Sequence, residues 1–196
     1  MAERDGYILR PMETSDLETV WKWRNSLRIR REMYTDHEIS WEEHTAWFRC
    51  ISETGTSLHY VFEAHDRKLG VVNVVDISQT HSRCHWGFYI GETDAPRGSG
   101  TIMGFLALEH LFEELDFHRV IGEAIASNGA SIKYHKRLGF QEEGRLIDHA
   151  CKNGYYIDVI AMAIIKDRWL RIKPRLEEKF FTKGGKQCLI LKSDNI

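Results

Sequence analysis

Proline is scarce in this sequence, with three residues among 196, and the 15 glycines are spread along the chain rather than gathered in repeats. This composition excludes a collagen-like or linker-dominated protein. No apolar run approaches the roughly 18–20 residues that a membrane-spanning helix needs. The opening residues, MAERDGYILR, lack the apolar core of a secretory signal peptide. We therefore expect a cytoplasmic protein that has no membrane partner.

Paired cysteines and a full set of metal ligands are also missing. The four cysteines are far apart and form no C-x-x-C motif, so we expect reduced thiols rather than disulfides. His81, Cys84 and His85 come nearest to a metal-ligand cluster. A zinc site needs three or four ligands with characteristic spacing, and no second cluster follows. We therefore expect no metal.

Charge of one sign dominates only near the C-terminus. Apolar residues make up 42% and charged residues 29% of the chain, as in an ordinary globular domain, and the formal net charge is −2. Residues 166–196 nevertheless carry nine Lys and Arg against four Asp and Glu, a net charge of +5. We expect one domain at 1–170 and a solvated basic extension at 171–196, with no nucleic-acid partner.

The hydrophobic pattern predicts a single α/β domain in which helices flank a mixed, mainly antiparallel sheet. Period-two alternation and short apolar runs predict strands at 7–12, 58–64, 70–77, 84–90, 120–126, 145–150 and 155–164. Helical spacing predicts helices at 17–27, 41–52, 101–115 and 128–138. Ser40 is the expected N-cap of the second helix, and Asn153-Gly154 is the expected turn of a hairpin.

One loop combines glycines with the start of a helix. Pro96-Arg97-Gly98-Ser99-Gly100-Thr101 lies between a predicted strand and a predicted buried helix. Glycine lets backbone N–H groups approach a ligand, and a helix N-terminus carries partial positive charge, so the loop suits a pyrophosphate. A purely structural turn uses the same residue types. The P-loop ending G-K-[ST] and the full dinucleotide pattern G-x-G-x-x-G are both missing, which disfavours nucleotide hydrolysis and hydride transfer.

The order of motifs after this loop resembles the GNAT superfamily of acetyl-CoA-dependent N-acetyltransferases. The sequence RGSGTIM is followed by an apolar helix, a strand, and Asn128-x-x-Ser131-x-x-Tyr134-x-x-x-Leu138-Gly139-Phe140. The resemblance covers roughly residues 5–167 and implies acetyl-CoA as cosubstrate, although Ile102 departs from the small residue usual at the end of the loop. It implies cofactor contacts from Phe88, Tyr89, Ile90, Arg97, Gly98, Ser99, Gly100, Thr101, Ile102, Asn128, Ser131 and Lys133.

The resemblance also implies catalytic roles. Tyr134 matches the tyrosine that faces the thioester sulfur, where a phenol of pKa about 10 can protonate the leaving thiolate. Glu123 is the candidate base that removes a proton from the attacking amine, and a backbone N–H of strand 86–90 is the candidate donor to the oxyanion. The alternatives are a core tyrosine at 134 and a solvated or salt-bridged carboxylate at 123. His85 is the second candidate base.

The N-terminal helices are expected to shape the acceptor site. The WRN element at 23–25 resembles ribosomal-protein N-terminal acetyltransferases. The longer run with Met33 and H-x-x-W-F is similar to acetyltransferases of the pseudaminic-acid pathway, which act on the 4-amino group of a UDP-linked dideoxy sugar. Arginines suit a diphosphate, and Met and aromatic side chains suit the methyl and acetamido groups of a deoxy sugar. The candidate substrate residues are Arg24, Asn25, Arg30, Met33, Tyr34, Phe48 and His85.

Other interpretations of the same region stay open. In the simplest alternative, the arginines of the N-terminal helices are solvated and the aromatic side chains belong to the core. We expect the core assignment to hold for Trp21 and Trp47. A protein N-terminal acetyltransferase is the second enzymatic hypothesis. A CoA-binding regulatory module without turnover is the third hypothesis, and a homodimer is one option for assembly.

Overall fold

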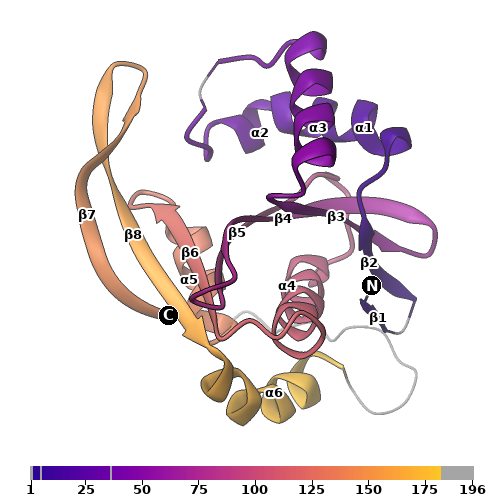
Figure 1. Cartoon of the computed structure of the whole chain (residues 1–196), viewed down its shortest axis with the longest axis vertical. Coiled ribbons are helices and arrows are strands. Elements are labelled where there is room, and N and C mark those ends of the chain that lie inside the picture. The colour runs from indigo at the N-terminus through magenta and orange to yellow at the C-terminus, as the bar shows by residue number, and fades with distance from the viewer. Residues whose placement is uncertain (1, 5, 36, 182–196) are drawn as a thin grey trace.

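The computed structural model describes residues 2–4, 6–35 and 37–181 (Figure 1). Every strand and helix predicted from the sequence is present within two to four residues of its expected bounds, with β1, η1, α2, η2 and α6 in addition. The elements are β1 (Ala2–Arg4), β2 (Tyr7–Pro11), η1 (Thr14–Asp16), α1 (Leu17–Asn25), α2 (Leu27–Arg30), α3 (Trp41–Thr54), β3 (Leu58–Ala64), β4 (Arg67–Ser78), β5 (Arg83–Ile90), α4 (Ser99–Glu109), η2 (His110–Glu114), β6 (Arg119–Ile125), α5 (Gly129–Arg137), β7 (Gln141–Lys152), β8 (Tyr155–Ile165) and α6 (Lys166–Phe180).

The eight strands form one sheet in the order β1-β2-β3-β4-β5-β6-β8-β7. Every neighbouring pair is antiparallel except β5 and β6, so the predicted mixed, mainly antiparallel sheet is confirmed. The parallel register runs from Arg83 opposite Arg119 to Trp86 opposite Gly122 and ends there. Beyond that point β5 stays paired with β4 and β6 with β8. The sheet therefore opens in its middle.

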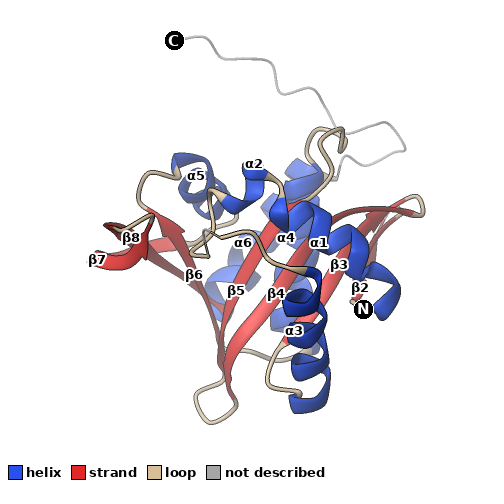
Figure 2. Cartoon of the chain, turned by 90° about the horizontal axis from the view of Figure 1, so that it is seen from above, coloured by secondary structure: helices blue, strands red, loops and turns tan. Residues whose placement is uncertain are grey.

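Helices cover both faces of the sheet (Figure 2). Alternation along β3 sends Phe62 into a large core with α4 and α6, and sends Val61 into a smaller core with α1 and α3. Helix α4 is buried on almost every side, as its apolar sequence predicts. Trp169 of α6 is fully buried against Phe105 of α4. The two cores fix the sheet between its helical layers.

The N-terminal helix is shorter than predicted because the chain leaves the helical conformation at Ser26, where ψ is 137°. The expectation that Trp21 is a core residue was wrong in its register. Trp23 is the buried residue, whereas Trp21 is only half-buried and donates from its indole to the carbonyl of Ile39 at 2.7 Å. Leu27, placed on the same apolar face by its spacing, is 70% exposed.

The remaining predicted N-terminal features have mixed outcomes. Ser40 caps α3 by accepting from the N–H of Glu43 at 3.1 Å, as predicted. Trp47 is partly buried against the smaller core. A short turn, η1, precedes α1. Asp16 is fully buried at this corner and is bonded by Arg10 at 2.7 Å and Lys68 at 2.7 Å.

The C-terminal part of the described chain is a long hairpin followed by a helix. Asn153 and Gly154 both have positive φ, at 50° and 80°, as the predicted tight turn between β7 and β8 requires. Helix α6 runs across residue 170, so the boundary expected there falls inside a packed helix. The rest of the expected basic extension, residues 182–196, lies outside the described residues. In the part of the chain that is described, no helix is long and apolar enough to cross a membrane.

Candidate active site

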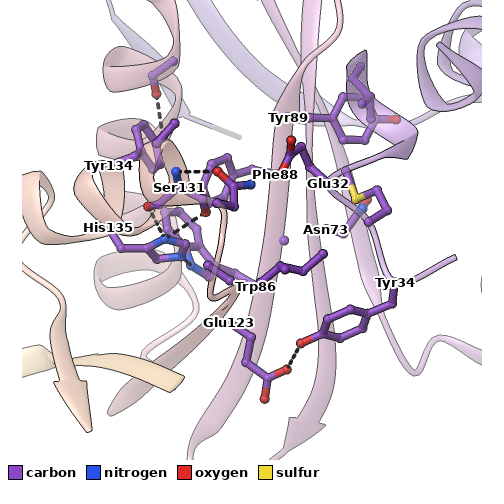
Figure 3. Close-up of a pocket in the computed structure, with 18 of the residues that line it drawn as sticks. Glu32, Tyr34, Asn73, Trp86, Phe88, Tyr89, Glu123, Ser131, Tyr134 and His135 are labelled. Atoms are coloured by element: carbon purple, nitrogen blue, oxygen red, sulfur yellow. Dashed lines mark hydrogen bonds between the residues drawn. The ribbon is translucent and has the colours of Figure 1, made fainter. Parts of the chain in front are cut away.

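A cavity of about 740 Å³ lies where β5 and β6 diverge (Figure 3). This volume is in the range of pockets for a small molecule or cofactor. Its wall is made by β4 to β6, by the first turns of α4 and α5, and by the segment that follows α2. Of the predicted site residues, it brings together Met33, Tyr34, His85, Phe88, Tyr89, Ile90, Gly100, Glu123, Asn128, Ser131 and Tyr134.

The predicted phosphate loop lies at the start of α4. Gly98 has a φ of 96°, which glycine adopts without strain, and its carbonyl accepts from the N–H groups of Thr101 and Ile102. Gly100 lines the cavity, and Arg97 is exposed beside it. Ser99 and Ile102 are buried, so their contribution to a ligand is limited to the backbone. No side chain caps the N-terminus of α4 by a hydrogen bond, which leaves this helix end open to a pyrophosphate.

Helix α5 supplies the opposite wall of the opening. Asn128 is its N-cap, because Oδ1 accepts from the N–H of Ser131 at 2.9 Å. The amide of Asn128 therefore organises the helix start in addition to lining the cavity. Lys133 is exposed and does not line the cavity.

Tyr134 reaches from α5 to α4. Its hydroxyl donates to the carbonyl oxygen of Gly100 at 2.6 Å, and its ring lies 4.5 Å from that of Phe88. Gly104 makes this approach possible, because a Cβ at that position would lie 2.2 Å from the hydroxyl oxygen. Burial raises the pKa of Tyr134, so the phenol stays protonated at neutral pH. The structure thus presents a protonated hydroxyl at the edge of the cavity.

A buried pair that the sequence analysis missed supports this wall. The indole of Trp86 donates to Nε2 of His135 at 3.1 Å, while Nδ1 of His135 contacts the carbonyl of Ser131 at 2.8 Å. Nε2 must therefore accept and Nδ1 must donate, which fixes a neutral imidazole. Burial lowers the pKa of His135 to about 4. The pair links the last residue of β5 that is paired with β6 to helix α5.

Tyr34 and Glu123 meet at the other end of the cavity. The phenol of Tyr34 donates to Oε2 of Glu123 at 2.7 Å, although the two residues are 89 positions apart. Burial and this bond raise the pKa of Tyr34. Among the described residues, no lysine or arginine forms an ion pair with Glu123, which removes the salt-bridge alternative. Met33 and Tyr89 pack beside them against the smaller core.

The hairpin of β7 and β8 holds the segment that carries Tyr34. Lys152, at the end of β7, donates from Nζ to the carbonyl oxygens of Arg30 at 3.2 Å and Arg31 at 2.6 Å, and to that of Met33. These carbonyls are at the C-terminal end of α2, where a positive charge is favourable. This end of the cavity is therefore held by contacts between segments that are far apart in the sequence.

Four predicted substrate residues do not line the cavity. Asn25 bonds to the backbone of Ile39 through both ends of its amide, at 2.8 and 2.9 Å, and Phe48 packs into the smaller core. Burial lowers the pKa of the Arg24 guanidinium, which lies within α1. The guanidinium of Arg30 is partly exposed, and its Nη1 lies 3.8 Å from Oε2 of Glu38. Arg24 and Arg30 were expected at a diphosphate, and Phe48 was expected against the sugar.

Several residues that line the cavity were not among the predicted site residues. Arg28 donates to the carbonyls of Ile90 and Gly91, at 3.1 and 2.7 Å, and ties α2 to the end of β5. The carboxylates of Glu32 and Asp76 and the amide of Asn73 also line the wall. Only the sheet register and the course of the segment after α2 bring them together.

The sequence led us to expect reduced thiols and no metal site. Cys50, Cys84 and Cys151 are free thiols, and Cys188 lies outside the described residues. Within the described ranges, no group of three or more His, Cys, Asp and Glu side chains is placed to hold a metal ion.

Comparison with known proteins shows similarity to acetyltransferases in sequence and in fold. The family model described as the acetyltransferase (GNAT) domain matches residues 7–141. Spermidine N(1)-acetyltransferase of Escherichia coli (strain K12) is 25% identical over 162 residues, which cover 83% of this chain and 87% of that protein. Acetyltransferase PseH of Campylobacter jejuni (strain 81-176) is 22% identical over 142 residues, which cover 71% and 87%. The crystal structure of spermidine N-acetyltransferase from Vibrio cholerae with CoA and spermine has a TM-score of 0.79 at 22% identity, covering 85% of this chain and 99% of that one.

The buried His135 predicts a loss of stability in mild acid. Its pKa is about 4 in the folded protein against 6.5 in an exposed chain, so the unfolded state binds the proton more readily. The contribution of neutral His135 to the free energy of unfolding is therefore complete above pH 6.5. It decreases by up to about 3 kcal/mol as the pH falls toward 4. His135→Gln should flatten this part of the pH dependence of the unfolding free energy, as measured by urea denaturation.

The matched control is His149→Gln, at an exposed histidine on β7 that has no buried contact to lose. If His135→Gln keeps the full acid dependence of the wild type between pH 6.5 and 4, another group causes it.

Proposed function

Because this chain belongs to the GNAT acetyltransferase family, it is an acetyl-CoA-dependent N-acetyltransferase, and we propose that its acceptor is the 4-amino group of a UDP-linked dideoxy amino sugar. The observation that carries this proposal is the Tyr34–Glu123 bond. This bond joins Tyr34, in the segment that resembles sugar-nucleotide acetyltransferases, to Glu123 of β6. Strand β6 borders the opening of the sheet.

Glu123 is the proposed base. Acetyl-CoA supplies a thioester whose carbonyl carbon is attacked by a neutral amine, forming the N–C bond as the C–S bond breaks. An amine is protonated at neutral pH, so a carboxylate within the cavity is needed to take its proton. The hydroxyl of Tyr34 holds Oε2 of Glu123 and leaves Oε1 for the amine or for a water between them. His85 lines the same cavity and is the alternative base.

Tyr134 is the proposed acid. Its hydroxyl lies between α4 and the end of β5, and its raised pKa keeps it protonated, so that it can donate a proton to the sulfur as negative charge develops on the leaving thiolate. The bond to the Gly100 carbonyl orients this hydroxyl and has to be exchanged when the proton moves. Residues of β5 after Trp86 have no partner in β6, so their backbone N–H groups are the proposed donors to the oxyanion.

The acceptor end of the cavity supports a deoxy sugar. Met33, Tyr89 and Ile29 provide apolar contacts, as in sites that recognise a small molecule by shape. The similarity to PseH, over 142 residues at 22% identity, adds support. A diphosphate would lie outside the cavity, where α2 carries Arg30 with its guanidinium partly exposed.

A polyamine is the second candidate acceptor, and one specific observation favours it. Glu32, Asp76 and Glu123 place three carboxylates on the cavity wall, whereas Arg28 is the sole arginine or lysine among the lining residues. Carboxylates attract a polycation and repel a diphosphate. Spermidine acetyltransferases of Escherichia coli and Vibrio cholerae are also among the similar proteins.

A thiol-release assay with acetyl-CoA separates these candidates. The purified protein is given UDP-4-amino sugars, spermidine and N-terminal peptides, and we expect the highest kcat/KM with a UDP-4-amino sugar. A higher value with spermidine would establish the second candidate instead, and a higher value with a peptide would indicate the ribosomal type. Acetyl-CoA binding without CoA release on any amine would indicate a regulatory module.

Tyr134→Phe tests the acid. The variant keeps the ring between Phe88 and α4 and removes the proton, so kcat should fall by about 10²–10⁴-fold while the Kd for acetyl-CoA changes little. The alkaline decline of the wild-type rate should lie above pH 10, because burial raises the pKa of Tyr134, and the variant should lack it. A wild-type kcat in the variant would mean that water protonates the thiolate.

Arg30→Ala tests the proposed diphosphate contact. Loss of a charge-assisted bond to phosphate should raise the KM for the UDP-linked sugar by roughly ten-fold or more, with an unchanged Kd for acetyl-CoA. Arg31→Ala is the matched control, since Arg31 is exposed and pairs with Glu32. Equal weakening of both ligands would indicate that Arg30 acts in folding.

A further inference from the structure

Asn73 is a polar residue of the cavity wall that the proposed mechanism does not use. It lies on β4, where it is paired with His59 of β3 on one side and with Gly87 of β5 on the other. Asn73 lines the cavity on the same side as Glu32 and Tyr34 (Figure 3). The neighbouring strands therefore hold Asn73 at the acceptor end, on the rigid part of the sheet.

A chain of hydrogen bonds fixes which end of the Asn73 amide faces inward. Oδ1 is 2.8 Å from Nδ1 of His59, and Nε2 of His59 is 2.8 Å from the hydroxyl of Ser57. Because an amide oxygen only accepts, Nδ1 must carry the proton, and Nε2 accepts from Ser57. The ring of His59 is held in turn by the indole of Trp47, with 5.0 Å between ring centroids.

The amide nitrogen is left for a ligand. With Oδ1 occupied by His59, the NH₂ group of Asn73 carries two donors, and it donates to no side chain or carbonyl in residues 2–4, 6–35 and 37–181. A fixed donor in a cavity favours a ligand that places an oxygen acceptor against it, because an unmet donor loses hydrogen bonding to water.

We propose that Asn73 is a specificity-determining residue that donates a hydrogen bond to a hydroxyl or acetamido oxygen of the acceptor. The assignment rests on the proposed function and narrows it. A sugar that bears the amine offers such oxygens next to it. A protonated polyamine offers only donors, so it leaves the NH₂ group of Asn73 without a partner and brings like dipoles together.

Asn73→Asp is the sharpest test, since it changes only the inward end of the side chain. The carboxylate still accepts from His59, so the contacts with β3 are kept, while the NH₂ donor becomes an acceptor. We expect the KM for the UDP-4-amino sugar to rise by roughly 10–100-fold, with kcat within about two-fold and an unchanged Kd for acetyl-CoA. The KM for spermidine should fall, because the variant adds a fourth carboxylate to the wall.

Asn73→Leu separates loss of the donor from addition of charge. It removes the amide at similar size, and we expect the KM for the amino sugar to rise in the same direction by roughly ten-fold. An unchanged KM for the amino sugar in Asn73→Leu, or in both variants, overturns the assignment while leaving the proposed function in place. A wild type that releases no CoA with any UDP-4-amino sugar overturns the proposed function and this assignment with it. The calorimetric Kd for acetyl-CoA confirms the fold of each variant.

Discussion

The functional half of the molecule depends on the point where β5 and β6 cease to pair. Four residue pairs join these strands, and after Trp86 and Gly122 each strand continues with its other neighbour alone. A parallel pair in the middle of an otherwise antiparallel sheet can diverge because each strand keeps a full ladder on its other side. The divergence leaves backbone groups and side chains of both strands facing a cavity, without loss of the sheet as a whole.

The residues around this opening show how the divergence is stabilised. Trp86, at the last paired position, is bonded to His135 of α5, and α5 is wedged beside the opening through its cap at Asn128. Gly122 accommodates that contact, since a Cβ there would lie 2.4 Å from Nε2 of His135. The indole and imidazole thus pack together at the point where the strands separate. Because this buried polar pair is satisfied in one arrangement, it fixes the position of α5.

Local signals in the sequence were sufficient for most of the strands and helices and for much of the cavity. Ser40, Gly98 and Asn153-Gly154 act through their immediate neighbours, so their caps and turns could be predicted. Trp21 was expected in the core from its position on a helix, but packing against Gly91 and a bond to Glu92 select Trp23 instead.

Arginine partners could not be predicted from the sequence for a related reason. Arg24, Arg28 and Arg30 lie close together in the sequence, yet the fold partly buries the first, ties the second to the end of β5 and leaves the third partly exposed. The choice of partner for a long charged side chain depends on tertiary neighbours. Asn73 and His135 were missed because their partners lie on other elements.

The bonds of Lys152 to the end of α2 also set an order of events during synthesis. The segment that bears Tyr34 is made early, whereas its partner Glu123 and its support at Lys152 emerge from the ribosome 89 and about 120 residues later. Domain-sized chains fold as units once their long-range partners exist. The contacts that hold Tyr34 are therefore available only after most of the chain has been made, and a nascent chain that ends before β7 lacks the bonds of Lys152 to this segment.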